Sequence, residues 1–363
     1  MTVQSIYDEV LKKMTKKAEL IGSTFPHIGK NGKWDNMEEK DITWWTNGYW
    51  PGMMWQMYDI TGDSVFKNIA DECEEKLDKA FDAFWGLHHD VGFMWGYSAV
   101  ANYTVTGNLR SKNRAMHAAN LLAGRYNIKW GAMASWNGGK VCKTIIDNMM
   151  NLRLLFWAAR ETHDMRFKHI AIAHADKMLE TLIRKDGTAH HLCEFNSETG
   201  ELIQFLGGQG YSADSQWSRG QAWAIYGFTR MYENTGDEKY LFAAQKCADN
   251  FIRQCKGKTP AWDFCAPEEN GFTPDTSAGT CAASGIITMA KYTDNKDIYI
   301  NAAKSVLVDI YENYKSDGEM LIEGGTGNYP AHRDINVGII YGDFYFLEAL
   351  RKLCDRSYRN IYI

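Results

Sequence analysis

Two kinds of helical segment alternate along this chain. One kind is apolar nearly all round and rich in small and aromatic residues, as in GFMWGYSAVANYTV at 92–105. The other kind has apolar residues on one face only, as in SVFKNIADECEEKLDKAF at 64–81. A helix that is apolar all round is buried, whereas a helix with one apolar stripe lies at the periphery of a fold. The pattern therefore predicts inner and outer helices in alternation.

Short turns join each inner segment to the outer segment that follows it. Three of them read MYDITGD at 57–63, NYTVTGN at 102–108 and MYENTGD at 231–237. The glycine of each turn suits the left-handed end of a helix, and the Asp or Asn after it suits the N-cap of the next helix. Each turn therefore predicts a helical hairpin.

The hairpins add up to six inner and six outer helices, the first outer helix lying at about 4–20. We expect the inner helices at 48–60, 92–106, 147–162, 217–235, 277–292 and 338–353. Two concentric rings are the simple closed arrangement of such helices. The sequence therefore predicts an all-α fold, an (α/α)6 barrel, and the absence of a Pro-rich linker predicts one domain over residues 1–363.

The long connections from outer to inner helices emerge together at one end of such a barrel. They are polar and aromatic, and we expect the functional residues there. Within one of them, segments 188–195 and 200–206 have the composition of strands and predict a small β-hairpin on the active-site face.

The amino-acid composition limits the classes of ligand that the protein could bind. The chain contains 13 Trp, 19 Tyr and 16 Phe, and aromatic faces stack on sugar rings and line concave sites. A carbohydrate ligand and a tryptophan-rich core are both compatible with this content. The net charge is −5 and no basic block occurs, which argues against a nucleic-acid partner.

The cysteines, the N-terminus and the lack of long apolar segments predict the cellular compartment of the protein. Eight cysteines occur without a CxxC pair, as expected of reduced core residues rather than of a disulfide framework or a zinc site. The N-terminus lacks the apolar run of a signal peptide. No segment approaches the roughly 18–20 apolar residues that span a bilayer. These features predict a cytoplasmic protein without a membrane partner.

Two aspartates stand directly before inner helices, Asp90 in GLHHDVGFMW and Asp147 in TIIDNMMNL. Each could be a helix N-cap or a catalytic carboxylate, and their position at the same barrel end favours a catalytic pair. The apolar neighbours of Asp147 favour a protonated carboxyl group that acts as an acid. Asp343 in YGDFYF is a third candidate, or else a buried structural residue.

Arg219 lies between two tryptophans, Trp217 and Trp223. A buried guanidinium needs an anion, which here is either a substrate carboxylate or an acidic side chain of the protein.

Other polar and aromatic residues of the same connections are candidates for substrate binding. The histidines and the glutamine could bind hydroxyl or carboxylate groups, and the tryptophan could stack on a sugar or belong to the core. No HxH or HExxH spacing is present, so we expect neither a metal nor another cofactor. These candidates are His89, His191, Gln209 and Trp45.

Several motifs together resemble glycoside hydrolase family 88, the unsaturated glucuronyl hydrolases. They are WTNGYWPGMMW, HHDVGF, IIDNMMNL, DSQWSRGQAWAIYGF and IYGDFYFLEALRKL, and the similarity runs in order from about residue 5 to 355. The resemblance implies an (α/α)6 barrel. It also implies an enzyme that removes a 4,5-unsaturated uronic acid from the non-reducing end of oligosaccharides made by polysaccharide lyases, glycosaminoglycan disaccharides in particular.

The resemblance also implies roles for single residues. Asp147 matches the general acid/base of the family and Asp90 its second essential carboxylate. The positions that match substrate-binding residues are Trp45, His191, Gln209, Trp217, Arg219 and Trp223. The expected partner is an unsaturated oligosaccharide, and the expected assembly is a monomer or a weak homodimer.

Two departures from the family pattern leave the preferred glycan open. Some members have a histidine where this chain has Gly208, and the stretch RDINVGII at 333–340 lacks the Ser/Lys cluster that some members use for sulfated substrates. The alternatives are an unsaturated rhamnogalacturonyl hydrolase, a sugar epimerase on the same barrel, and a glycan-binding barrel without activity.

Overall fold

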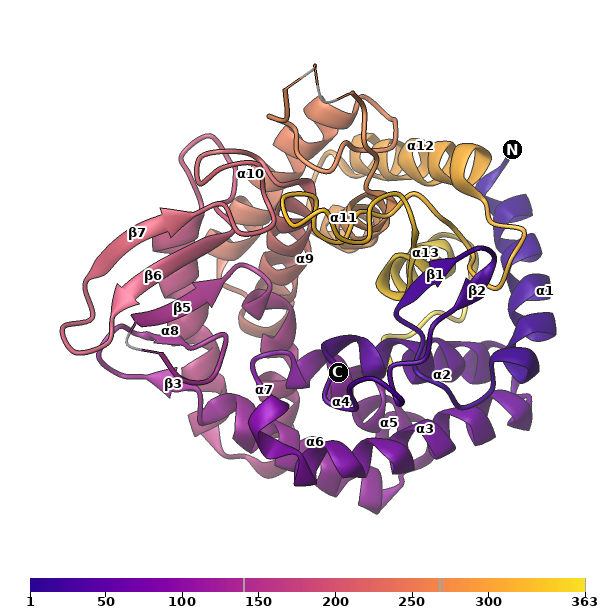
Figure 1. Ribbon diagram of the computed structural model, residues 1–363, viewed down its shortest axis with the longest axis horizontal. Coiled ribbons are helices and arrows are strands. Elements are labelled where there is room, and N and C mark those ends of the chain that lie inside the picture. The colour runs from indigo at the N-terminus through magenta and orange to yellow at the C-terminus, as the bar shows by residue number, and fades with distance from the viewer. Residues whose placement is uncertain (140, 268, 270, 363) are drawn as a thin grey trace.

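The computed structural model describes residues 1–139, 141–267, 269 and 271–362. Helices form two concentric rings, with the outer helices at the rim of the view and the inner ones around the centre (Figure 1). The outer helices are α1 (Val3–Ile21), α3 (Ser64–Asp82), α6 (Leu109–Ala123), α8 (Met165–Leu182), α10 (Glu238–Cys255) and α12 (Lys296–Tyr314). The inner positions hold α2 (Tyr49–Thr61), α4 (Val91–Tyr97) with α5 (Ala99–Thr106), α7 (Asn148–Thr162), α9 (Ser218–Thr235), α11 (Thr276–Met289) and α13 (Ile340–Cys354). The predicted (α/α)6 barrel is confirmed.

Burial follows the hydrophobic pattern. Every residue of α11 is buried, whereas α3 buries only one stripe of residues that includes Phe66, Cys73 and Leu77. The predicted difference between inner and outer helices is therefore confirmed.

The hairpin turns have the predicted chemistry. Gly107 and Gly236 adopt left-handed conformations with φ of 76° and 70° at the ends of α5 and α9. The side chains of Asn108 and Asp237 then accept hydrogen bonds from backbone amides in the first turns of α6 and α10. Each turn stops one helix and starts the next, as the sequence indicates.

The second inner position differs from its prediction as one helix over 92–106. It is broken at Ser98, where ψ is −77°, and the Ser98 hydroxyl donates to the carbonyl of Met94 at 2.7 Å. A serine that bonds back to the preceding turn bends a helix, which explains the division into α4 and α5.

The predicted β-hairpin is present as part of a larger sheet. β6 (Leu192–Asn196) and β7 (Leu202–Leu206) pair antiparallel, and β5 (Val141–Ile145) adds a third strand to β6. The sequence does not predict β5, because its pairing partner lies some 50 residues further along the chain. Two more small sheets join β1 (Ile28–Lys30), β2 (Lys33–Trp34) and β8 (Gly338–Ile339), and β3 (Tyr126–Asn127) with β4 (Ala132–Met133).

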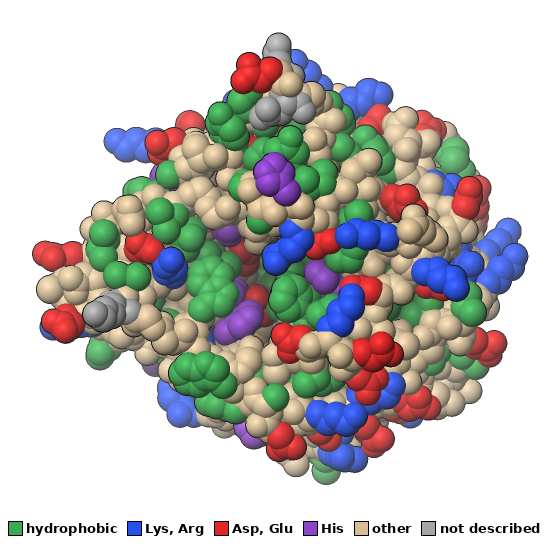
Figure 2. Space-filling view, in the orientation of Figure 1, with side chains coloured by type: hydrophobic (Ala, Val, Ile, Leu, Met, Phe, Trp, Pro, Cys, Tyr) green, Lys and Arg blue, Asp and Glu red, His purple; other side chains and the backbone are tan. Residues whose placement is uncertain are grey.

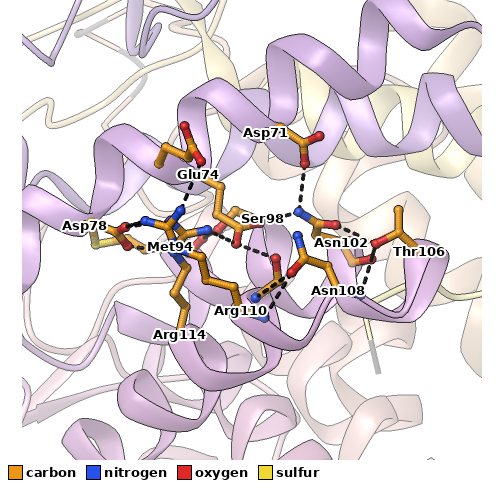
Figure 3. Close-up of polar contacts among 12 residues, drawn as sticks. Asp71, Glu74, Asp78, Met94, Ser98, Asn102, Thr106, Asn108, Arg110 and Arg114 are labelled. Atoms are coloured by element: carbon orange, nitrogen blue, oxygen red, sulfur yellow. Dashed lines mark hydrogen bonds and ion pairs between the residues drawn. The ribbon is translucent and has the colours of Figure 1, made fainter.

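A buried ionic cluster holds the first two hairpins together (Figure 3). Arg114 on α6 binds Glu74 on α3 at 2.7 Å and Asp78 on α3 through two nitrogens. Asn102 on α5 donates to Glu74 at 2.8 Å. Because the Glu74 carboxylate is buried yet fully hydrogen-bonded, the cluster fixes an inner helix against two outer ones.

The helices of the described residues include none that is both long enough and apolar enough to cross a bilayer.

Candidate active site

The two candidate aspartates share one cavity at the end of the barrel where the long connections meet. The cavity has a volume of about 400 Å³ and lies in the central hollow of the face shown in Figure 2. The expectation that Asp90 and Asp147 lie at the same barrel end is confirmed. Nine of the ten candidate residues, all except Asp343, line this cavity: Trp45, His89, Asp90, Asp147, His191, Gln209, Trp217, Arg219 and Trp223.

Neither aspartate acts as a helix cap. Asp90 precedes α4 and Asp147 precedes α7, yet neither side chain accepts a hydrogen bond from the helix that it precedes. By contrast, Asp63, Asp164 and Asp237 before the outer helices all cap through their side chains. The inner aspartates therefore direct their carboxylates away from the helix ends, and capping does not explain their presence.

Asp90 and His89 lie side by side, and the pKa of each is shifted toward its uncharged form. His89 Nδ1 lies 2.6 Å from the Ser135 carbonyl and must donate to it, which places the unprotonated Nε2 3.1 Å from Asp90 Oδ1. Burial and the nearby Asp147 charge raise the pKa of Asp90 well above its ordinary value, and burial lowers the pKa of His89 well below its own. Both shifts favour the uncharged forms of the two side chains.

Asn151 connects the two aspartates. It lies one helical turn after Asp147, and its amide nitrogen is 3.3 Å from Asp90 Oδ1 and 3.4 Å from the Asp147 carbonyl. Its amide oxygen accepts from the backbone N–H of Phe93 at 2.8 Å, which sets the orientation of the amide. Sequence reasoning missed Asn151, although the i, i+4 spacing within IIDNMMNL was the available signal.

The Asp147 carboxylate has one uncommitted oxygen. Its Oδ1 is buried without a hydrogen-bond partner among the described residues, and its Oδ2 lies 3.5 Å from His191 Nε2. His191 Nδ1 accepts from the backbone N–H of Gln209 at 2.9 Å, so its Nε2 carries the proton and faces Asp147. Asp147 itself lines the cavity, so a ligand bound there would lie beside this carboxylate.

The structure shows a protein acid as the partner of Arg219, the second of the two interpretations offered by the sequence. The guanidinium is 2 % exposed, forms an ion pair with buried Asp275 and donates to the carbonyls of Thr326 and Gly327. It also donates to Gln209 Oε1 at 2.5 Å. Gln209 therefore keeps its amide nitrogen for a ligand, and a direct contact of Arg219 with substrate stays a prediction.

Aromatic rings form the wall of the cavity. The Trp45 ring is half-buried and lies 5.0 Å from the Tyr341 ring, and Trp217 packs 4.3 Å from His191. Trp223 is buried against Phe93. Three more aromatic lining residues were not among the candidates, although Trp44 adjoins Trp45 and Tyr341 belongs to the motif IYGDFYF: Trp44, Trp136 and Tyr341.

Asp343 is structural. Its carboxylate accepts from the backbone amides of Leu321 at 2.7 Å and Ile322 at 3.1 Å. Burial raises its pKa to about 7. Of the two interpretations of this residue, the structure supports the buried structural one.

One group in the cavity has the atoms to ligate a metal ion. His88, His89 and Asp90 present ligand atoms that all lie within 4.8 Å of one another. His89 Nε2 lies 3.1 Å from Asp90 Oδ1 and has no hydrogen-bond partner among the described residues, and His88 Nδ1 lies 3.4 Å from Asp90 Oδ2. The expectation that the site binds no metal stays a prediction.

Comparison with known proteins gives consistent results. The model of Glycosyl Hydrolase Family 88 matches residues 6–353. An unsaturated glucuronyl hydrolase of Bacillus sp. (strain GL1) is 32% identical, over 96% of this chain and 96% of that protein. The crystal structure of an unsaturated glucuronyl hydrolase from Streptococcus agalactiae superposes with a TM-score of 0.92 at 29% identity, over 99% of this chain and 94% of that one. A variant of that enzyme complexed with dGlcA-GalNAc6S gives 0.85 at 28% identity, over 99% and 93%.

Proposed function

The chain belongs to glycosyl hydrolase family 88, and on this basis we propose that it releases a 4,5-unsaturated uronic acid from the non-reducing end of oligosaccharides left by polysaccharide lyases. The observation that carries the proposal is the pair of non-capping aspartates, Asp90 and Asp147, in one aromatic-walled cavity. The names of the relatives support unsaturated glycosaminoglycan disaccharides as the substrate class.

The reaction is a hydration followed by ring opening. The C4=C5 bond of the substrate is an enol ether conjugated to a carboxylate. A proton added at C4 leaves positive charge shared by C5 and the ring oxygen, and water then adds to C5. The resulting hemiketal opens to a ketone and the aglycone leaves, so one water is consumed. Two carboxylates on opposite sides of a glycosidic bond are not required.

Asp147 is the proposed general acid and base. Asp147 lines the cavity, and its Oδ1 has no hydrogen-bond partner among the described residues. The acid gives its proton to C4, and the carboxylate then takes a proton from the water that attacks C5.

Asp90 is the proposed second carboxyl group. Burial and the Asp147 charge raise its pKa, so it enters the reaction neutral and its carboxyl group can form a hydrogen bond with a substrate hydroxyl. Because Asp90 is neutral, Asp147 is the group that gives a proton to C4 and takes one from the attacking water. Asn151 holds the two aspartates in fixed positions relative to each other, because its amide nitrogen contacts Asp90 Oδ1 and the backbone carbonyl of Asp147.

The remaining candidates bind and orient the sugar. Trp45 and Trp217 offer faces for stacking, and His191 and Gln209 offer donors for hydroxyl or carboxylate oxygens. Arg219 positions Gln209 and adds positive potential beside the substrate carboxylate.

A direct test is the near-ultraviolet absorbance of the conjugated enoate. Mixing the protein with unsaturated chondroitin, hyaluronan or heparin disaccharides should abolish the absorbance, since hydration removes the conjugated double bond. An unsaturated rhamnogalacturonan disaccharide serves as the control substrate. Loss of absorbance with that substrate alone would favour the rhamnogalacturonyl alternative, and no loss with any substrate would contradict the proposal.

We also propose that the chain forms one catalytic domain, lies in the cytoplasm and is a monomer or a weak homodimer. All eight cysteines are free among the described residues, which suits a reducing compartment. A single cooperative unfolding transition and sedimentation over a range of concentrations test the domain and assembly statements.

A further inference from the structure

A second cavity of about 460 Å³ opens beside the catalytic one. The two share His27, Ile28, Trp44, Arg333 and Asp334 as lining residues, so they form one continuous cleft. The catalytic cavity has the size of a site for one small molecule, which corresponds to a disaccharide. A longer substrate has to continue beyond it, and the second cavity, here called the side cavity, is an adjoining continuation.

The side cavity is positively charged although the protein carries a net charge of −5. Lys30, Lys33, Lys40 and Arg333 line it, against Asp35 and Asp334. Blue side chains border the hollow in Figure 2 on the side where Figure 1 shows β1 and β2. Local positive charge in a cleft raises the concentration of anionic ligands there.

The positions of two of these lysines destabilise the strand pair in which they lie. Lys30 and Lys33 are direct cross-strand partners in the β1–β2 hairpin, and like charges opposite each other in a strand pair are destabilising. Lys30 is paired with Asp334 at 3.0 Å and Lys40 with Asp35 at 2.7 Å. Lys33 is exposed and has no ion-pair partner within the described ranges, so its charge is available to a ligand.

The hairpin that carries the lysines is rigid. β1 pairs with β8 through Ile28 opposite Ile339. Glu319 accepts from the Trp34 amide at 2.8 Å and donates its own amide to the Gly32 carbonyl at 2.9 Å. A preorganised site loses less entropy when a ligand binds.

The junction of the two cavities has unsatisfied polar atoms. Trp44 Nε1 and His27 Nδ1 are buried without a hydrogen-bond partner in the part of the chain that the structure describes. Their rings lie 5.2 Å apart, and Trp34 adds a partly exposed aromatic surface to the side cavity. Buried polar atoms without partners are rare in folded proteins, and a ligand that crosses the junction would satisfy them.

We propose that the side cavity is a binding site for an anionic sugar unit beyond the disaccharide, held by Lys33, Arg333 and neighbouring lysines on the aromatic surface of Trp34. The proposal rests on the proposed function. The anion is either the carboxylate of the next uronate or a sulfate, and both present oxygens to ammonium and guanidinium groups in the same way. The protein would then act more efficiently on acidic tetrasaccharides than on disaccharides of the same type.

The test compares Lys33→Glu with the parent protein on four substrates, the unsaturated disaccharides and tetrasaccharides of hyaluronan and of sulfated chondroitin. Lys16→Glu is the matched control, because Lys16 is also exposed but lies on outer helix α1. The measured quantity is the ratio of kcat/KM for tetrasaccharide to kcat/KM for disaccharide. Reversal of one exposed charge should lower this ratio by roughly three- to tenfold, and Lys16→Glu should leave it unchanged.

The outcomes separate the two proposals. A lowered ratio with hyaluronan identifies the uronate carboxylate as the anion, and a lowered ratio with sulfated chondroitin alone identifies sulfate. An unchanged ratio, or equal losses on both lengths of substrate, overturns the side-cavity proposal. A parent protein that turns over no unsaturated disaccharide refutes the proposed function itself. Thermal unfolding of both variants verifies that they are folded.

Discussion

Replacement of Gly208, which lines the candidate site, by alanine should damage that site by displacing His191. Gly208 has φ of +59°, and a Cβ built there would lie 2.2 Å from His191 Nδ1 and 2.6 Å from its Cε1. Ordinary contacts begin at 3.4 Å, so the ring must retreat by about 1.2 Å, the difference between 3.4 and 2.2. The displaced ring loses the Gln209 N–H bond at 2.9 Å and no longer directs Nε2 at Asp147.

The magnitude follows from three contributions. A left-handed backbone costs about 1–2 kcal/mol for a residue with a Cβ. Loss of the hydrogen bond to His191 adds about 0.5–1.5 kcal/mol. Displacement of a group beside the reacting carboxylate by about 1 Å lowers turnover by roughly 10- to 100-fold.

Gly236→Ala is the matched control. Gly236 has φ of +70° at the end of α9, and a Cβ there would meet nothing within 4 Å. The Gly236→Ala variant should be destabilised only by the cost of a left-handed backbone and should keep full turnover. In a His191→Ala background, Gly208→Ala should likewise cost no more stability than Gly236→Ala, because the overlap is gone.

Urea unfolding and steady-state kinetics on one unsaturated disaccharide measure both effects. The reasoning is refuted if Gly208→Ala turns over substrate like the parent protein and is destabilised no more than Gly236→Ala.

Four further predictions concern the carboxylates, the arginine and metal dependence. Asp147→Asn should fold and bind an unsaturated disaccharide but lose roughly 10²–10⁴ in turnover, because an amide cannot exchange the proton; parental turnover would move the acid role elsewhere. The stability that the raised pKa of Asp90 provides is complete below about pH 4 and is lost as pH rises through its folded pKa. Asp90→Asn should therefore gain stability relative to the parent with increasing pH in urea titrations, and a constant difference would argue against a protonated Asp90. Arg219→Lys should raise KM and lower Tm, because lysine cannot keep the contacts with Gln209 and the two carbonyls together; unchanged KM would restrict the arginine to its ion pair with Asp275. Turnover should survive exhaustive dialysis against a chelator, whereas a loss that divalent ions restore would place a metal on His88, His89 and Asp90.

The sequence was most informative where local chemistry decides the structure. Inner and outer helices, their glycine ends and their Asp or Asn starts follow from periodicity and capping, which act within a few residues. The break at Ser98 and strand β5 escaped prediction for opposite reasons. The hydroxyl of Ser98 competes with the helix only in its final geometry, and β5 needs a partner strand from another hairpin.

The sequence predicts which residues form the site, but it does not predict the protonation states of the carboxyl groups. Polar and aromatic residues at the starts of inner helices had to converge at one barrel end, and all the candidates except Asp343 line the cavity there. The expectation of a protonated Asp147 stays a prediction. The raised pKa of Asp90 depends on burial and on the nearby Asp147 charge, and neither is visible in a motif.

The pairing of the first strand with the last has a consequence for synthesis. β1 follows the first helix and β8 precedes the last, yet Ile28 lies opposite Ile339, and the cavity wall needs Gly327, Arg333 and Tyr341. On the ribosome, the early hairpins can form while the ring stays open, because their contacts are local. The ring of helices can close only after the final helix has been synthesised. Its closure costs the conformational entropy of bringing distant segments together. The nascent enzyme therefore acquires its substrate pocket in the last step of folding, and a chain that ends before α13 leaves the apolar faces of α1 and α2 uncovered.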